Sequence, residues 1–313
     1  SGSLELIYRP FYWKKIAFEF LLGVDYQNIS VTSQTIPEPN AEAEIVTDGT
    51  GDLIIPYVGV ALSRRERTYA FSGSLQLETN VSSIDETNRN QLGRVNVDED
   101  FMILSYGAQG SLFLEPLFKR DAWGNPDSWE DSRLAHEVRF LFSGQFGFSK
   151  RLFAQKELVL GGMDRVRGYP ESTRAGDDGF MASFEYAYHI PRALKPITVM
   201  QREASESGAG PMKLQEPFMG RYNLRPPDVF ALPDWDFVLK AFLDVGATYV
   251  TDPDFNESDA TLMGAGIGFE VQLSSLASLR VDWGMALEEI ERGGEVEVES
   301  GDSRVHVRLQ VTW

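Results

Sequence analysis

Residues 16–26 read IAFEFLLGVDY, and apolar side chains occupy every second position of this stretch. The even positions from Ile16 to Tyr26 are all apolar or aromatic, whereas the odd positions include Glu19 and Asp25. This period of two is typical of a β-strand with one apolar and one polar face. The same alternation recurs along the chain, in residues 69–78, 138–149, 180–190, 237–249, 261–273, 279–287 and 305–313. The sequence therefore predicts an all-β protein.

The composition excludes several classes of protein. The 313 residues include 29 basic and 47 acidic side chains, a formal net charge of −18 at pH 7. This excess of negative charge repels phosphate backbones, which argues against nucleic acid as a partner. The absence of cysteine excludes disulfides, cysteine nucleophiles and the common zinc sites. No stretch approaches the roughly 20 apolar residues of a transmembrane helix, so a helical membrane protein is excluded.

The second face of the strands distinguishes the remaining architectures. A soluble sandwich favours Lys, Glu and Thr on the face that meets water. Here that face carries small residues and sparse charges of both signs, among them Gly246, Gly264, Gly266, Gly268, Ser183, Glu185, Lys240, Asp244, Glu270, Arg280 and Asp282. Such a face fits the inside of a large closed barrel, whose apolar outer face meets lipid. Aromatic residues are available for the interfacial girdles of such a barrel, at Tyr26, Tyr106, Tyr188, Tyr249, Trp283 and Trp313.

The connectors favour this transmembrane antiparallel β-barrel over the alternative of a soluble sandwich or calyx. Outer-membrane barrels have short turns on one side and long loops on the other. Residues 64–66 and 274–275 predict tight turns, and three long acidic loops are predicted at residues 30–52, 81–99 and 291–302. Two long connectors, at about residues 116–132 and 192–235, are predicted on the short-turn side, and the second is a Pro-rich insertion expected to have little regular structure.

Residues 158–180 carry the most specific motif of the chain, because they are too polar and too rich in glycine to continue a strand. Gly161-Gly162 is followed by Val166-Arg167-Gly168-Tyr169, and further ordered matches are Gly176-Asp177, Phe184-Glu185-Tyr186, the segment FLDVG at residues 242–246 and the segment GAGIGF at residues 264–269. Together these segments resemble the BamA/TpsB superfamily of outer-membrane β-barrels, which includes assembly factors and two-partner secretion transporters. The match is closest to the ShlB/FhaC-like secretion-transporter branch.

This resemblance implies a sixteen-stranded barrel whose sixth extracellular loop, loop 6, folds back into the lumen. In this chain loop 6 covers about residues 158–179, with Arg167 at its tip. The resemblance makes Asp244 the leading partner of Arg167, and the alternation turns Glu185, Glu270 and Asp282 toward the lumen as further partners. Trp313 takes the place of the terminal aromatic residue of the last strand, where the family most often has Phe.

Residues 1–313 are expected to form one outer-membrane barrel domain, in which about 10 to 12 strands are recognisable from the pattern. The resemblance implies more strands than this, so the N-terminal part of the barrel is expected to be missing or unrecognised. No periplasmic POTRA module is expected in the chain. A shortened barrel must still satisfy its edges in lipid, through an altered strand count or another chain.

The sequence shows no enzymatic site. It has no Gly-x-Ser-x-Gly elbow, and His136, His189 and His306 all lie in strand patterns. The glycines of residues 264–268 lie within a strand and open no helix, so they do not form a phosphate-binding loop. Residues 252–263 begin like a calcium loop but have Glu257 at the sixth position, which the EF-hand pattern does not allow. We expect no enzyme activity, no cofactor and no metal.

The predicted function is polypeptide translocation across the bacterial outer membrane, with export or activation of a partner exoprotein. Insertion of other β-barrel proteins into the outer membrane is an alternative within the same class, and a passive or structural pore is an alternative of another class. The predicted partners are outer-membrane lipid, an unfolded β-rich polypeptide, and POTRA modules or accessory proteins.

Overall fold

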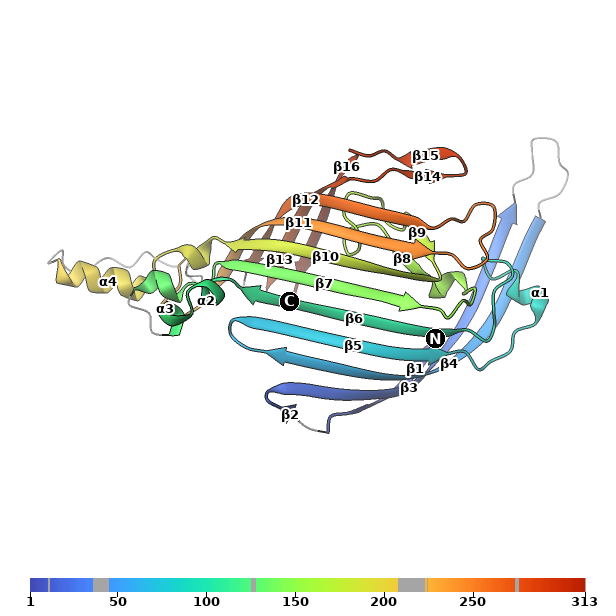
Figure 1. Ribbon diagram of the computed structural model, residues 1–313, viewed down its shortest axis with the longest axis horizontal. Helices are drawn as coiled ribbons and strands as arrows, with labels where there is room; N and C mark the ends of the chain where they lie inside the picture. The colour runs from blue at the N-terminus through green and yellow to red at the C-terminus, as the bar shows by residue number, and fades with distance from the viewer. Residues whose placement is uncertain are drawn as a thin grey trace.

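The protein is dominated by one large antiparallel sheet (Figure 1). The computed structural model describes residues 1–10, 12–35, 45–124, 128–207, 223, 225–273 and 276–312. Neighbouring strands of the sheet pair in the order β1 (Gly2–Tyr8), β3 (Ile16–Thr35), β4 (Ile45–Arg65), β5 (Tyr69–Thr79), β6 (Met102–Phe113), β7 (His136–Phe146), β10 (Asp178–His189), β11 (Trp235–Tyr249), β12 (Ala260–Leu273), β13 (Ala277–Ala286) and β16 (Ser303–Val311), while β2 (Tyr12–Trp13) pairs with β3. This sequential order confirms the predicted all-β fold and its antiparallel strands.

The remaining elements lie in the connectors. Two short hairpins pair β8 (Leu158–Leu160) with β9 (Arg174–Gly176) and β14 (Ile290–Arg292) with β15 (Glu295–Val298). The helices are short: α1 (Glu86–Arg89), α2 (Glu115–Phe118), α3 (Arg120–Gly124), α4 (Ile197–Glu206) and the 3₁₀ turns η1 (Trp129–Ser132), η2 (Ala154–Lys156) and η3 (Pro191–Ala193). Among the helices of the described residues, none has the length and apolar character needed to cross a membrane.

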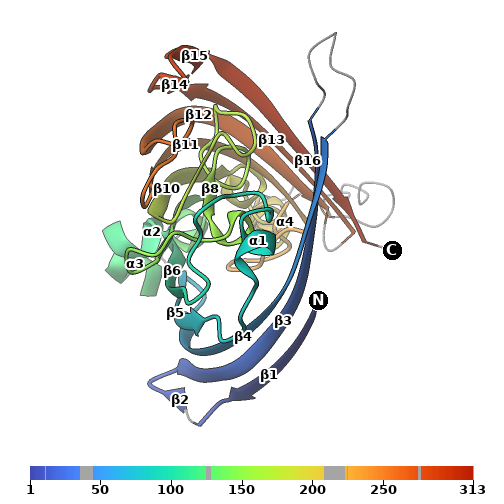
Figure 2. The same cartoon turned by 90° about the vertical axis from the view of Figure 1, so that its right-hand side faces the viewer.

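The sheet is strongly curved and wraps around the segment that carries β8 (Figure 2). Its first and last strands, β1 and β16, are exposed along nearly their whole length, and within the described ranges no ladder joins them. The number of strands agrees with the prediction of about 10 to 12. The implied sixteen strands and the closure of the barrel stay predictions.

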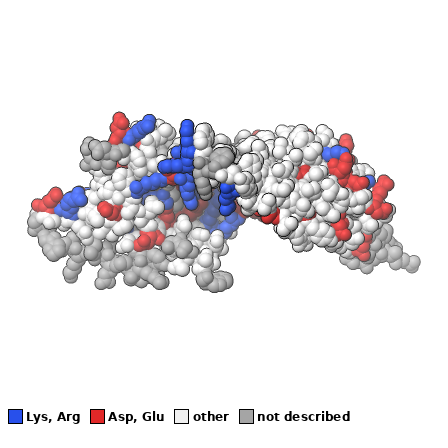
Figure 3. All heavy atoms as spheres, turned by 90° about the horizontal axis from the view of Figure 1, so that it is seen from below, with Lys and Arg blue, Asp and Glu red and all other residues white. Residues whose placement is uncertain are grey.

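The two faces of the sheet differ as the alternation predicted. On β3 the outward Phe20, Leu22 and Val24 are exposed, whereas Gly23 between them is buried. The surface between the central hollow and the right-hand end of the molecule in Figure 3 is almost free of charged atoms, and charged atoms are visible inside the hollow. This uncharged outer surface has the composition that a hydrocarbon layer requires.

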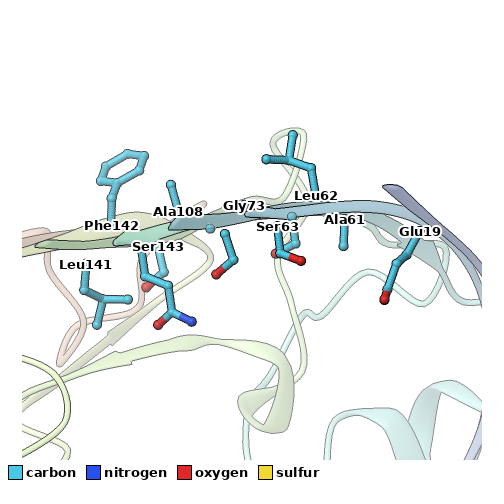
Figure 4. A pocket seen from close by; sticks show the side chains of 13 residues that line it. Glu19, Ala61, Leu62, Ser63, Gly73, Ala108, Leu141, Phe142 and Ser143 are labelled. Atoms are coloured by element: carbon cyan, nitrogen blue, oxygen red, sulfur yellow. The ribbon is translucent and has the colours of Figure 1, made fainter. Parts of the chain in front are cut away.

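The inner face changes in character along the sheet. In Figure 4, Phe142 and Leu62 point to one side of the sheet, and Leu141 and Glu19 point to the other. The hollow in that view has a volume of about 360 Å³ and lies against β3 to β7, where the inner side chains are mostly Ser, Gly and Ala. The charged inner residues gather farther along the sheet, on β7 and β10 to β13.

The connectors divide between the two ends of the sheet. The antiparallel order places residues 80–101, 147–177, 250–259 and 287–302 at one end, which we call the loop end, and residues 9–10, 12–15, 66–68, 114–124, 128–135, 190–207, 225–234 and 276 at the other, the turn end. The two long connectors predicted on the short-turn side do lie at the turn end. Loop 6 begins and ends at the loop end.

Three details of the predicted connectors were wrong or cannot be compared. Residues 30–35 and 45–52 continue β3 and β4 instead of forming a loop, because their Ile, Val and Thr residues suit extended pairing. Part of the Pro-rich insertion forms α4, whose first N–H groups donate to the carbonyl oxygens of Pro226 and Pro227. The predicted turn at residues 274–275 lies outside the described residues.

Two apolar clusters attach the connectors to the inner face. The first joins Leu53 and Ile55 of β4 to Leu92 and Phe101 of the connector 80–101 and to Phe153. The second joins the hairpin β8–β9 and the tip of loop 6 to the wall, and its members are Leu158, Leu160, Val166, Tyr169, Met181, Leu262, Ala286, Ile290 and Val298. Since full burial of one such side chain contributes about 1.5–3 kcal/mol, the second cluster holds loop 6 firmly inside the curve of the sheet.

We predict that the outward face tolerates charge far less than the inner face. Leu243 lies near the middle of β11 on the outward face, so Leu243→Arg should lower the unfolding free energy in lipid vesicles by about 2–4 kcal/mol. Gln109→Arg on the inner face of β6 is the matched control and should have little effect. Equal effects of the two substitutions would contradict a lipid-facing outer surface.

Candidate functional site: the docked tip of loop 6

The tip of loop 6 lies against the inner face of β10 to β13. Gly161 and Gly162 adopt positive φ angles of 103° and 93°, conformations that L-residues rarely take, and turn the chain from β8 toward the wall. Residues 163–170 then run along the wall, before the chain returns through β9. The short β8–β9 hairpin and the second apolar cluster fix the base of this excursion.

Arg167 is almost completely buried, and every N–H of its guanidinium has an acceptor. Nε donates to Oδ2 of Asp244 at 2.7 Å, and Nη2 donates to Oδ1 of Asp244 at 2.8 Å and to Oγ of Ser183 at 3.1 Å. Nη1 donates to Oε2 of Glu185 at 2.9 Å and to Oδ2 of Asp282 at 3.1 Å. The backbone N–H of Arg167 donates to Asp244 as well, at 3.1 Å. Bidentate, charge-assisted bonds of this kind offset the cost of removing a guanidinium from water.

An aromatic ring completes the surroundings of this guanidinium. Cζ of Arg167 lies 3.4 Å from the centroid of the Phe242 ring. Phe242 is two residues before Asp244 on the same face of β11 and is buried. A desolvated cation over an aromatic face gains on the order of 2 kcal/mol. The ring also occupies space that water would otherwise fill beside the charge.

The wall is made of glycine where the loop backbone touches it. A Cβ atom on Gly264 would overlap the carbonyl oxygen of Arg167, and one on Gly284 would lie 2.7 Å from the backbone nitrogen of Gly168. Gly168 itself has a φ of +101°, and a Cβ there would lie 2.7 Å from the carbonyl carbon of Met285. Loop and wall therefore meet backbone to backbone, which places the guanidinium of Arg167 within reach of three strands.

The other residues of the motif secure the tip on both sides of Arg167. Val166 is fully buried in the second apolar cluster. Tyr169 is also fully buried, and its hydroxyl lies 2.9 Å from the carbonyl oxygen of Met263 and 2.8 Å from that of Glu288. The same hydroxyl accepts the backbone N–H of each of these two residues. Tyr169 thus links the tip to β12 and to the connector that follows β13.

The structure corrects the predicted set of partners of Arg167. Asp244, Glu185 and Asp282 contact it directly, but in the described part of the chain no hydrogen bond or ion pair joins it to Glu270. The carboxylate of Glu270 instead accepts from Nζ of Lys240 at 2.8 Å and from Nη1 of Arg139 at 3.2 Å. The reason is the register, which sets Glu270 opposite Val238 of β11, six residues before Asp244.

The four predicted wall glycines have different neighbours. Gly264 lies beneath the loop tip, as described above. A Cβ on Gly268 would lie 3.1 Å from Cε of Lys240, one on Gly266 would lie 2.6 Å from Cζ of Phe242, and one on Gly246 would lie 2.8 Å from Cδ1 of Leu160. Each glycine leaves room for one buried side chain or backbone segment. Trp313, the predicted C-terminal signal, lies outside the described residues.

A second buried cluster lies at the loop end, which we call the loop-end cluster and define as Arg94, Arg151, Glu157, Asp177 and Glu257. Nη2 of Arg94 donates to Oδ2 of Asp177 at 3.0 Å, and Nε of Arg94 donates to Oε1 of Glu257 at 2.8 Å. Arg151 pairs with the other oxygen of Glu257 at 2.8 Å. These bonds tie three connectors together at the loop end, namely residues 80–101, 147–177 and 250–259.

The pKa values of two carboxyl groups in the loop-end cluster, Glu157 and Glu257, are shifted in opposite directions. Burial raises the pKa of Glu157 to about 7, with Asp177 and Glu257 adding to this rise and Arg94 opposing it. Glu257 is also partly buried, but its bonds from Arg94, from the backbone of Asp254 and from Arg151 lower its pKa to about 2. Glu157 therefore changes charge near neutral pH, whereas Glu257 stays ionised.

The three histidines lie at strand positions, as predicted. His136 contacts the hydroxyl of Tyr186 at 2.6 Å, and His306 faces the tip of loop 6. His189 is buried at the turn end, with Nδ1 at 2.8 Å from Asp236 and Nε2 at 3.0 Å from Glu137. Because a carboxylate faces each ring nitrogen, His189 is held as a structural ion-pair partner at the base of the insertion.

The sequence placed Ser183 and Lys240 on the inner face without a role in the site, and it did not identify Phe242 as a site residue. Phe242, Ser183 and Lys240 alternate into the interior with Asp244 and Glu185, so the period of two was a usable signal for them. An aromatic side chain among polar inner residues was the specific clue for Phe242. Arg94 and Arg151 belong to irregular connectors, where no periodicity indicates their positions.

Comparisons with known proteins identify the fold. No family model matches the sequence, and no curated protein matches it significantly. Among solved structures, CdiB from Escherichia coli matches 99% of this chain with a TM-score of 0.59 at 14% identity. CdiB from Acinetobacter baumannii matches 99% with a TM-score of 0.54 at 12% identity. The chain therefore has the fold of the matched part of these two CdiB structures. It spans 44% and 41% of the two CdiB chains, less than half of each.

We predict that the loop tip requires the bare glycine at position 264. Gly264→Ala should displace residues 163–170 from the wall, because the new methyl group overlaps the Arg167 carbonyl oxygen. Amide hydrogen exchange of that segment should then rise by at least about tenfold. Gly73→Ala on β5 is the control, since a Cβ there meets nothing closer than 3.5 Å. Unchanged protection in Gly264→Ala would show that the backbone contact is dispensable.

We predict a pH dependence from Glu157. Its pKa rises from 4.5 to about 7 on folding, so the stabilisation is fully present below pH 4.5 and is lost as the pH rises through 7. The unfolding free energy should fall by on the order of 2–3 kcal/mol between pH 5 and pH 8. In Glu157→Gln this share of the pH dependence should disappear. Urea unfolding of the wild type and of Glu157→Gln at the two pH values measures this difference. The same change of unfolding free energy with pH in both proteins would refute the role of Glu157.

Proposed function

We propose that this chain is the barrel part of an outer-membrane transporter of the two-partner secretion type, which exports a partner exoprotein. The main observation that supports this proposal is loop 6, whose tip residue Arg167 is buried inside a curved sheet. The fold of the chain matches CdiB over 99% of its length. Two-partner secretion transporters are the class to which the CdiB neighbours belong. The apolar outward face, exposed from β3 to β16, supports a location in the outer membrane.

In this proposal the docked loop 6 is the resting state of the transporter. The tip occupies the interior next to the charged part of the wall, where Arg167 bonds to three strands. Movement of this tip away from the wall would widen the interior for an extended polypeptide, whose backbone groups need polar partners inside a membrane. The process uses no nucleotide and no bond-making chemistry, so the protein is not an enzyme.

Deletion of the gene separates this function from the alternatives. Mass spectrometry of the culture medium should show the loss of one large exoprotein, and expression of the full-length protein should restore it. Loss of several outer-membrane β-barrel proteins from the membrane fraction would instead indicate an insertase. If neither fraction changes and purified protein conducts ions without any polypeptide, the protein is a passive pore.

We predict that export depends on the ion pair between Arg167 and Asp244. Arg167→Ala leaves the fully buried Asp244 without a cation, and breaking a buried pair in this way costs about 3–5 kcal/mol. The variant should therefore lose protection of residues 163–170 and release far less exoprotein into the medium. Asp244→Asn should have the same two effects.

The double variant Arg167→Met with Asp244→Asn is the control for folding. Removal of both charges is far less costly than removal of one, so its unfolding free energy should be close to that of the wild type. Export should still be impaired, because the docked state has lost its charged partners. Normal export by the single variants would contradict the proposed role of the docked loop.

A further inference from the structure

Lys240 is a second cation of the inner wall, and it is more completely enclosed than Arg167. It lies four residues before Asp244 on the same face of β11, and its side chain is 0% exposed. Its Nζ lies 2.8 Å from Oε1 of Glu270, 2.8 Å from Oδ1 of Asp282 and 3.7 Å from Oε2 of Glu185. Three strands, β10, β12 and β13, therefore each contribute one carboxylate to this ammonium group.

Lys240 and Arg167 share two of these carboxylates. Oδ1 of Asp282 forms an ion pair with Lys240 and Oδ2 forms an ion pair with Arg167, so Asp282 lies between the two cations. Glu185 directs Oε2 toward both of them. By contrast, the bonds of Asp244 in the described ranges come from Arg167 and from the hydroxyl of Ser183. The carboxylate acceptors of Arg167 thus form two groups. Asp282 and Glu185 keep Lys240 as a partner when the loop is absent, whereas Asp244 loses its cation.

Two other cations reach the same carboxylates from the open interior. Arg139 contacts Glu185 at 3.2 Å, and Arg280 contacts Asp282 at 2.7 Å. Each of these side chains is 29% exposed, so water shares in their solvation. Lys240 lies beneath the carboxylates, and Gly268 leaves space for the pair it forms with Asp282, since a Cβ there would overlap Oδ1 of Asp282 and would lie 3.1 Å from Cε of Lys240. An enclosed ammonium group fixes its partners more strictly than a hydrated guanidinium does.

We propose that Lys240 is a positioning residue for loop 6, which holds Asp282 and Glu185 as oriented, ionised acceptors for Arg167 whether or not the loop is docked. The inference rests on the proposed function in one respect, namely that docking of loop 6 is part of the transport cycle. It adds a part of the docking site that does not depend on the loop. Strand β11 carries Asp244, whose cation comes from the loop, and also Lys240, the cation that keeps Asp282 and Glu185 in place.

Hydrogen exchange of the amides in residues 163–170 of the purified, membrane-reconstituted full-length protein tests this inference. Lys240→Met should raise this exchange by at least about tenfold, as a docking equilibrium does when its acceptors lose their order. Exchange in β5 and β6 should stay at the wild-type rate. Lys240→Gln, which keeps a hydrogen-bond donor, should give a smaller increase and serves if Lys240→Met does not fold. Lys150→Met is the control, because Lys150 pairs with Asp100 on the exposed loop end.

Two double variants separate positioning from simple charge balance. Addition of Glu270→Gln to Lys240→Met restores neutrality of the wall but leaves Asp282 and Glu185 without their lysine, so fast exchange should persist. Addition of Lys240→Met to Arg167→Ala should change the hydrogen exchange of residues 163–170 little, because the acceptors then have no guanidinium to bind. Rescue by Glu270→Gln, or the same increase with and without Arg167, would overturn the inference.

The single variants also separate this inference from the proposed function. If Arg167→Ala exchanges fast and both Lys240 variants resemble the wild type, Lys240 does not position the acceptors, and the docked loop stands. If Arg167→Ala itself leaves residues 163–170 protected, the guanidinium does not hold the tip, and the basis of the proposed function fails.

Discussion

A guanidinium enclosed by a sheet is the constraint on which the arrangement of this protein depends. Arg167 has lost nearly all contact with water, and a charge in that position destabilises the fold unless each donor is matched and its positive charge is balanced. Five N–H groups in a fixed plane require acceptors from several directions, which one strand cannot supply. The acceptors come from β10, β11 and β13, so the motif arginine specifies how three strands of the wall are placed relative to one another. The glycines beneath the tip follow from the same requirement, because a side chain at Gly264 or Gly284 would move the arginine away from its partners.

The base and the tip of loop 6 are held by different sets of interactions, so the two parts differ in how freely they can move. The base is attached by the second apolar cluster and lies below the loop-end cluster, in which Asp177 immediately follows β9. The tip is attached by ion pairs, by close backbone contact to glycine, and by Val166 and Tyr169 in the same apolar cluster. Apolar burial is non-directional and tolerates small shifts, whereas the bidentate pair of Arg167 with Asp244 is lost when the tip moves by an ångström or two. Movement of the tip therefore breaks the Arg167 pair and also withdraws Val166 and Tyr169 from the cluster, while Leu158 and Leu160 keep the base of the loop attached to the sheet.

The sequence predicted the parts of this arrangement that are local or periodic. A period of two placed Asp244, Glu185 and Asp282 on the inner face, and the motif identified Arg167 as the residue that meets them. What it could not predict depends on register between strands that are far apart in the chain. Glu270 shares the inner face with Asp282, but the pairing of β11 with β12 sets it beside Lys240 instead of Arg167. The bond between Arg94 and Asp177 joins residues 83 positions apart through irregular connectors, for which no sequence pattern exists. The helix α4 was missed because its stability comes from bonds to the returning segment at Pro226 and Pro227 more than from its own composition.

The two groups of Arg167 acceptors also determine how much free energy is needed to undock loop 6 in a transport cycle. When the tip leaves, Asp282 and Glu185 still have Lys240, but Asp244 keeps only the hydroxyl of Ser183 as a partner within the described residues. Loss of a buried ion pair costs about 3–5 kcal/mol, and withdrawal of Val166 and Tyr169 from the second apolar cluster adds about 1.5–3 kcal/mol for each side chain. A substrate shifts such an equilibrium only by binding the undocked state more tightly than the docked one. The proposed exoprotein must therefore contribute free energy of this order inside the barrel, either by hydrogen bonds to the wall or by a group that satisfies Asp244. Without that contribution the loop returns to acceptors that have kept their positions, and the interior stays occupied.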